Sequence, residues 1–96
     1  MTDPSEYIKK QISDGIELPQ ENKKYFNTFT IGISPADSIL VLSQNGKQMI
    51  SLYASHSVIK SLTLELIKMI KNFETQTGQE ILTLSELEEK INNHNE

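Results

Sequence analysis

The stretch from Ile39 to Tyr53, ILVLSQNGKQMISLY, decides the fold of this 96-residue chain. Its Asn45-Gly46 pair is the strongest short-range signal for a two-residue β-turn, because a type I′ turn needs a positive φ at both central positions. The flanking residues are mostly β-branched or large and apolar, which favours strands. The sequence therefore predicts a tight hairpin with strands at about 38–44 and 47–54.

A third strand is expected before this hairpin. Residues 25–33 alternate between apolar and small or polar types, which is the period of a half-buried strand. The following Ser34-Pro35-Ala36-Asp37 reads as a turn, with Pro at the position where its fixed φ suits type I. We expect a three-stranded antiparallel meander in an α+β fold.

Two-residue turns would fix the register of the meander, and a strand places successive side chains on opposite faces. Leu42 then pairs with Met49, and Val41 pairs with Ile50. One face carries Ile39, Val41, Ile50 and Leu52. The other face is the candidate interface, and it carries Phe29, Ile31, Ile33, Leu40, Leu42, Met49 and Tyr53. Because both faces are apolar, we expect both to be covered, either by the terminal helices or by a second copy of the chain.

A long amphipathic helix is predicted at about 56–77, with Ser55 as N-cap and Gly78 just beyond its end. Its apolar positions recur at alternating spacings of three and four. The apolar arc is wider than one contact surface needs, so the helix is expected to touch two things. The residues of this arc are Val58, Ile59, Leu62, Leu66, Ile67, Met69, Ile70 and Phe73.

Short helices are expected at both ends of one 96-residue domain, giving segments 1–24, 25–78 and 79–96. The first would start with Asp3 as N-cap, run to about Ser13, and lead into a polar loop at 19–24. In the last, Thr83 and Glu86 have the spacing of a capping box. Its tail, 92–96, is expected to fray.

Composition excludes several kinds of site. The chain has no cysteine, so disulfides and thiolate chemistry are absent. Its net charge is −4 and its nine basic residues are all Lys, which disfavours nucleic-acid binding. No window is long and apolar enough to span a membrane, and no secretory signal is visible. We expect a cytoplasmic protein with no nucleic-acid or membrane partner.

No reactive group of residues stands out in the sequence. Ser55-His56-Ser57 combines hydroxyls with a base, but helix capping explains these residues better than catalysis. His94 has no metal-ligand spacing to His56. Lys60, Lys68 and Lys71 share one side of the long helix, as a solvated face would. We therefore predict no catalytic residue, no cofactor and no metal.

Short motifs between about residues 25 and 81 resemble those of domain-of-unknown-function family 3467, a group of small bacterial and archaeal proteins. They are Tyr25-Phe26-Asn27, Ser34-Pro35 and a Lys-bearing helix that ends in Phe73-Glu74 and Gly78. The chain departs from the family in its tight Asn45-Gly46 turn. The resemblance implies the strands and long helix, and it implies no established activity.

Two functions follow as hypotheses. The first is a non-enzymatic protein-interaction or regulatory module that acts as a homodimer, because two apolar sheet faces and a wide helix arc need covering. The alternative is a small-ligand-binding domain with a pocket between helix and sheet. Its polar anchors would be Thr28, Thr30, Ser51 and Tyr53.

Overall fold

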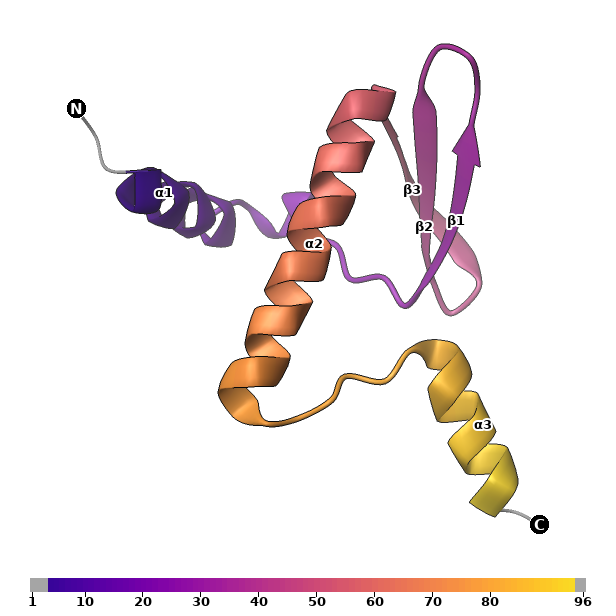
Figure 1. Cartoon of the computed structure of the whole chain (residues 1–96). Helices are drawn as coiled ribbons and strands as arrows, with labels where there is room; N and C mark the ends of the chain where they lie inside the picture. The colour runs from indigo at the N-terminus through magenta and orange to yellow at the C-terminus, as the bar shows by residue number, and fades with distance from the viewer. Residues whose placement is uncertain (1–3, 95–96) are drawn as a thin grey trace. The chain divides into compact units, whose positions relative to one another are not determined.

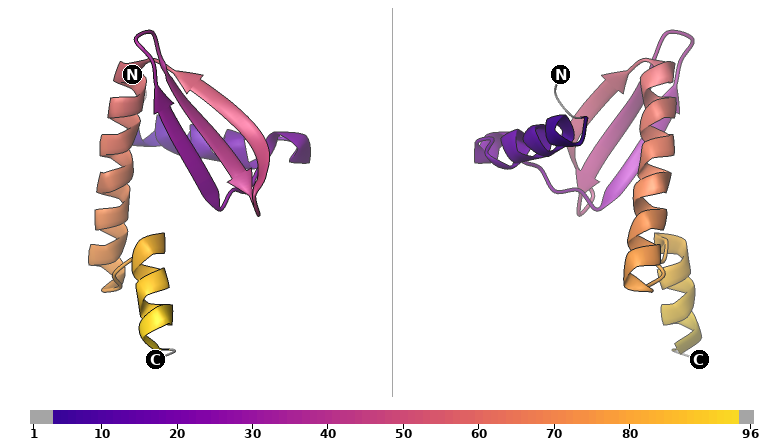
Figure 2. Two further views of the ribbon diagram at one scale, coloured as in Figure 1. Left: turned by 90° about the vertical axis from the view of Figure 1, so that its right-hand side faces the viewer. Right: turned by 60° about the vertical axis from the view of Figure 1, so that its left-hand side comes forward.

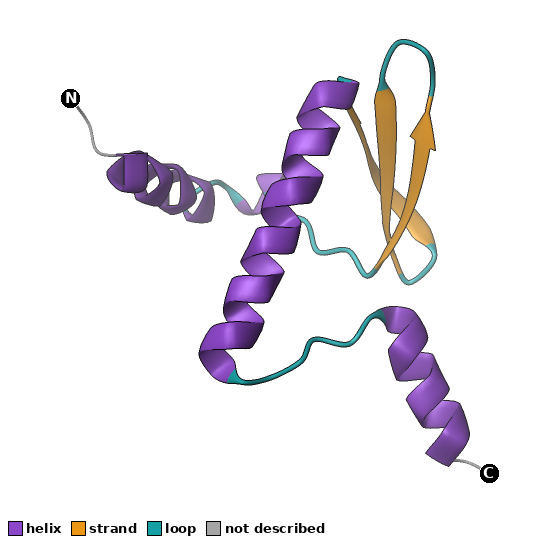
Figure 3. Ribbon diagram, in the orientation of Figure 1, coloured by secondary structure: helices purple, strands orange, loops and turns teal. Residues whose placement is uncertain are grey.

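The computed structural model describes residues 4–94 and confirms the α+β fold (Figures 1 and 3). Contacts divide the chain into two units. One unit holds the first helix and most of the sheet, and the other holds the turn at 33–38 and everything from residue 54 on. The elements are α1 (Pro4–Ile16), the short 3-10 helix η1 (Gln20–Asn22), β1 (Thr28–Ile33), β2 (Ser38–Gln44), β3 (Lys47–Ala54), α2 (His56–Thr77) and α3 (Leu84–His94).

The sheet is the predicted meander, with strand order β1-β2-β3 and a clear twist (Figure 2). β2 and β3 begin and end where the sequence predicts. Asn45 has φ 54° and Gly46 has φ 83°, the pair of positive values that the type I′ turn requires. The two-residue turn fixes Gln44 opposite Lys47, so the predicted pairing of Leu42 with Met49 follows.

The turn between β1 and β2 is held by Ser34. Its backbone N–H donates to the Asp37 carbonyl at 2.9 Å, and its hydroxyl accepts from the N–H groups of Ala36 and Asp37 at 3.2 Å each. A Cβ added to Gly32 would lie 3.1 Å from Ile39 Cγ2. Gly32 is therefore opposite Ile39 on the same face, which is the register that a two-residue turn predicts.

β1 begins at Thr28, three residues later than the predicted Tyr25, because Asn27 is hydrogen-bonded to Asn45 in the turn between β2 and β3. Its side-chain Nδ2 donates to Asn45 Oδ1 at 3.0 Å, and its Oδ1 accepts from the Asn45 backbone N–H at 3.0 Å. Its own N–H donates to the Ser43 carbonyl. These bonds leave Tyr25 and Phe26 outside the strand.

α1 runs to Ile16, beyond the predicted end at about Ser13. The helix continues through Gly15, and Lys10 Nζ lies 3.0 Å from Asp14 Oδ2, one turn along the helix. The predicted cap at Asp3 lies outside the described residues. The predicted polar loop contains η1, in which Lys23 N–H donates to the Gln20 carbonyl.

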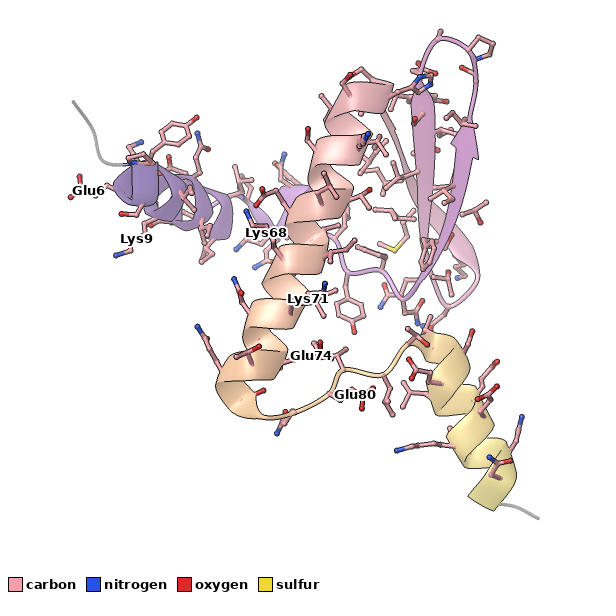
Figure 4. All side chains as sticks on the ribbon, in the orientation of Figure 1. Glu6, Lys9, Lys68, Lys71, Glu74 and Glu80 are labelled. Atoms are coloured by element: carbon pink, nitrogen blue, oxygen red, sulfur yellow. The ribbon has the colours of Figure 1, made fainter. Side chains whose placement is uncertain are left out.

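α2 has the predicted bounds and the predicted caps. The Ser55 hydroxyl accepts from Val58 N–H at 3.2 Å. At the other end Gly78 adopts the left-handed conformation with φ 70°, and its N–H donates to the Glu74 carbonyl at 2.9 Å. The Glu74 carboxylate also accepts from Ile81 N–H at 2.8 Å and holds the start of the loop that follows (Figure 4).

α3 begins with the predicted capping box. Thr83 N–H donates to Glu86 Oε1 at 3.0 Å, and Glu86 N–H donates to the Thr83 hydroxyl at 3.2 Å. The helix continues through Asn92 and Asn93 to His94. Of the tail that was expected to fray, residues 95 and 96 lie outside the described part of the chain.

The capping box makes the helicity of α3 dependent on pH. The hydrogen bond from Thr83 N–H holds the pKa of the Glu86 carboxyl below its ordinary value. At pH values above the pKa that Glu86 has in the unfolded chain, its carboxylate therefore stabilises α3. This contribution is lost as the pH falls through the lowered pKa of the folded state. Far-UV circular dichroism should show the loss in the native chain and a smaller one in Glu86→Gln, whose amide does not titrate. Equal acid transitions in the two proteins would contradict this role.

Candidate interaction surface

None of the hydrophobic side chains in the described part of the chain is buried. The residue that is buried there, at 6% exposure, is Ser38. The helices α1 and α2 bury no residue, and every residue of β1 is exposed. A chain of this composition normally buries its Leu, Ile and Phe side chains. The apolar surface is therefore the principal feature of the molecule.

The candidate interface forms one continuous face of the sheet, which we call the sheet patch. The two-residue turns place its members at alternating positions of the three strands. Exposure differs across it. Leu40 and Leu42 on the central strand are half-buried, whereas Ile31 is 70% and Ile33 78% exposed. The members are Phe29, Ile31, Ile33, Leu40, Leu42, Met49 and Tyr53.

The sheet borders a depression of about 240 Å³ on the side of β3. The segment at 24–26 lines it together with Leu42 and Met49 of the sheet patch. The sequence assigned Tyr25 and Phe26 to a strand, whereas they contribute to the wall of this depression. At about 240 Å³ it is smaller than a usual ligand pocket, which holds 300–1,000 Å³. Residues 24–26 therefore line a depression beside β3, whereas every residue of β1 is exposed.

The apolar arc of α2 is open as well. Leu62, Leu66 and Phe73 are each more than two-fifths exposed, and Ile59 is half-buried. The charged side chains of α2 include Lys68, which is labelled in Figure 4. Its Nζ lies 3.7 Å from Glu65 Oε1, and both side chains are solvated. Such a pair contributes little to stability. The helix therefore offers a second apolar surface.

The residues Ser55-His56-Ser57 are used structurally. Ser55 caps α2, and His56 Nε2 lies 2.8 Å from the Ser34 carbonyl oxygen, which can only accept a hydrogen bond. Nε2 therefore carries the proton and donates it, which ties the start of α2 to the β1–β2 turn. No group of three or more metal-ligating His, Asp or Glu side chains occurs within the described residues.

The four polar residues suggested as ligand anchors do not share one surface. Thr28 and Thr30 lie on the face of Gly32 and Ile39, whereas Ser51 and Tyr53 lie on the face of the sheet patch. The Thr28 hydroxyl donates to the Ser43 carbonyl at 3.4 Å. A single pocket could use one of these pairs and not both.

No helix among the described residues is both long and apolar enough to cross a membrane. No protein-family model, no curated protein and no solved structure matches the chain. The resemblance to domain-of-unknown-function family 3467 stays a prediction.

Proposed function

We propose that this chain is a non-enzymatic protein-interaction module that works as a homodimer in the cytoplasm. The observation that carries the proposal is the lack of any buried hydrophobic side chain between residues 4 and 94. Hydrophobic burial is the dominant favourable term in folding, so a chain without it needs another surface to pack against.

The apolar arc of α2 supports a further protein partner, because it is wider than one contact requires and most of its side chains are exposed. We assign the additional protein to this arc.

Light scattering on a sizing column tests the dimer. At micromolar concentration we expect a mass of about 22 kDa, twice the chain mass of 10.9 kDa. A folded species at the chain mass would contradict the proposal. For the second partner, affinity pulldown from the native cell should return a protein that a Met69→Glu variant, changed on the exposed apolar arc of α2, does not capture. Repeated pulldowns without any captured protein would remove the interaction role.

A further inference from the structure

We infer that the dimer forms by antiparallel pairing of β1 with β1 of the second copy, with the two-fold axis at Ile31. The product is a continuous six-stranded sheet with the order β3-β2-β1-β1-β2-β3. This inference rests on the proposed homodimer and names its contact. β1 is an edge strand of the three-stranded sheet, so one side of its backbone has no strand partner among residues 4–94.

The direction of the backbone groups follows from the β1–β2 turn. Ser34 N–H points to Asp37, and Gly32 is opposite Ile39. Within a strand successive N–H groups point to alternate sides, so Gly32 and Thr30 bond toward β2. The N–H and C=O groups of Phe29, Ile31 and Ile33 therefore face the open edge.

The register about Ile31 uses all of these groups. It places Ile31 opposite Ile31 of the second copy, and Phe29 opposite Ile33 of the second copy. Each of these is a hydrogen-bonded pair, so the six free donors and six free acceptors of the two strands are satisfied. A shift by two residues in either direction leaves one such residue on each strand without a partner.

The side chains fit the same register. Phe29, Ile31 and Ile33 all belong to the sheet patch and are 59%, 70% and 78% exposed. Pairing about Ile31 sets aromatic and β-branched side chains directly opposite one another, which is a stabilising cross-strand combination. On the other face Thr30 meets Gly32 of the second copy, where the missing side chain leaves room. The sheet patches of the two copies become one surface.

The sequence of β1 lacks the features that keep edge strands apart. Thr28–Ile33 contains no charged residue and no Pro, whereas β3 starts with Lys47. On β3 the outward backbone groups belong to residues 48, 50 and 52. Ile50 and Leu52 also line the depression together with Tyr25 and Phe26. Residues Tyr25 and Phe26 therefore lie close to β3, whereas every residue of β1 is exposed.

Cysteine cross-linking tests the register, because the chain has no cysteine of its own. Opposed residues of a hydrogen-bonded pair have Cα atoms about 5.5 Å apart, which suits a disulfide. We expect Ile31→Cys to form a covalent dimer on mild oxidation. In the matched control Phe29→Cys, the two cysteines would be about 14 Å apart, so cross-linking should be at least tenfold slower. Combining Phe29→Cys with Ile33→Cys should restore it.

Cross-linking at a position on β3 distinguishes a wrong contact from the absence of a homodimer. Ile50→Cys places the thiol at the residue about which two β3 edges would pair. If Ile31→Cys does not cross-link while light scattering still gives about twice 10.9 kDa, the contact is wrong and the homodimer stands, and cross-linking of Ile50→Cys would place the contact at β3. A mass of 10.9 kDa for the folded chain overturns both. Ile31→Lys adds an edge-blocking charge, and it should reduce the native dimer to monomer at micromolar concentration.

Discussion

Replacing Leu42 by Asp is expected to abolish the homodimer at micromolar concentration and to unfold most of the chain. Leu42 lies at the centre of the sheet patch, on the middle strand and opposite Met49. A carboxylate there would be partly desolvated beside Met49 and the wall of the depression, which destabilises each folded chain, and the dimer contains the substitution twice. A cost of about 4 kcal/mol per dimer weakens the dissociation constant roughly a thousandfold. Light scattering and far-UV circular dichroism on the same sample measure both effects.

The matched control for this substitution is Leu42→Met, which keeps an apolar side chain of similar volume and should stay dimeric. A well-folded dimer with Asp at position 42 would show that neither folding nor dimerisation depends on an apolar side chain at the centre of the sheet patch.

Replacing Gly46 by Val is expected to lower the unfolding temperature by about 8–16 °C. Gly46 has φ 83°, a conformation that a β-branched residue adopts only with strain of about 2 kcal/mol. Each kcal/mol shifts the midpoint of a domain this size by about 4–8 °C. The strain acts on the turn that sets the register of β2 and β3, so both sheet faces depend on it. Thermal denaturation followed by circular dichroism measures the shift.

Gly46→Asn is the control, because Asn tolerates the left-handed region and should retain most of the stability. Neither Val nor Asn would clash at position 46, since a Cβ there would meet no atom within 4 Å. Equal midpoints for the Val and Asn variants would mean that the turn adopts another conformation in solution.

Local signals were sufficient for most of the fold. The Asn45-Gly46 turn, the Ser55 cap, the Gly78 end and the Thr83–Glu86 box each depend on residues close in sequence, and each is confirmed. The start of β1 was wrong by three residues because it is set by Asn27 and Asn45, which lie 18 positions apart. A contact of that range has no signature in local propensity.

The sequence could predict which residues share the face of the sheet patch, but it could not predict how exposed each of them is. The register follows from two turns, so the sheet patch could be read from the sequence. The sequence could not show that Tyr25 and Phe26 border the β3 side while Ile31 and Ile33 stay open, because this depends on the path of residues 22–26. The choice of the β1 edge for the dimer contact rests on that difference.

The coupling of folding to dimerisation is tested most directly by the unfolding midpoint as a function of protein concentration. The unfolding enthalpy of a dimer of 96-residue chains is about 130 kcal/mol at 0.7 kcal/mol per residue. Since binding of a second copy stabilises only the native state, each tenfold dilution should lower the midpoint by about 4 °C. A midpoint that does not change between micromolar and millimolar chain concentration would contradict folding as a dimer.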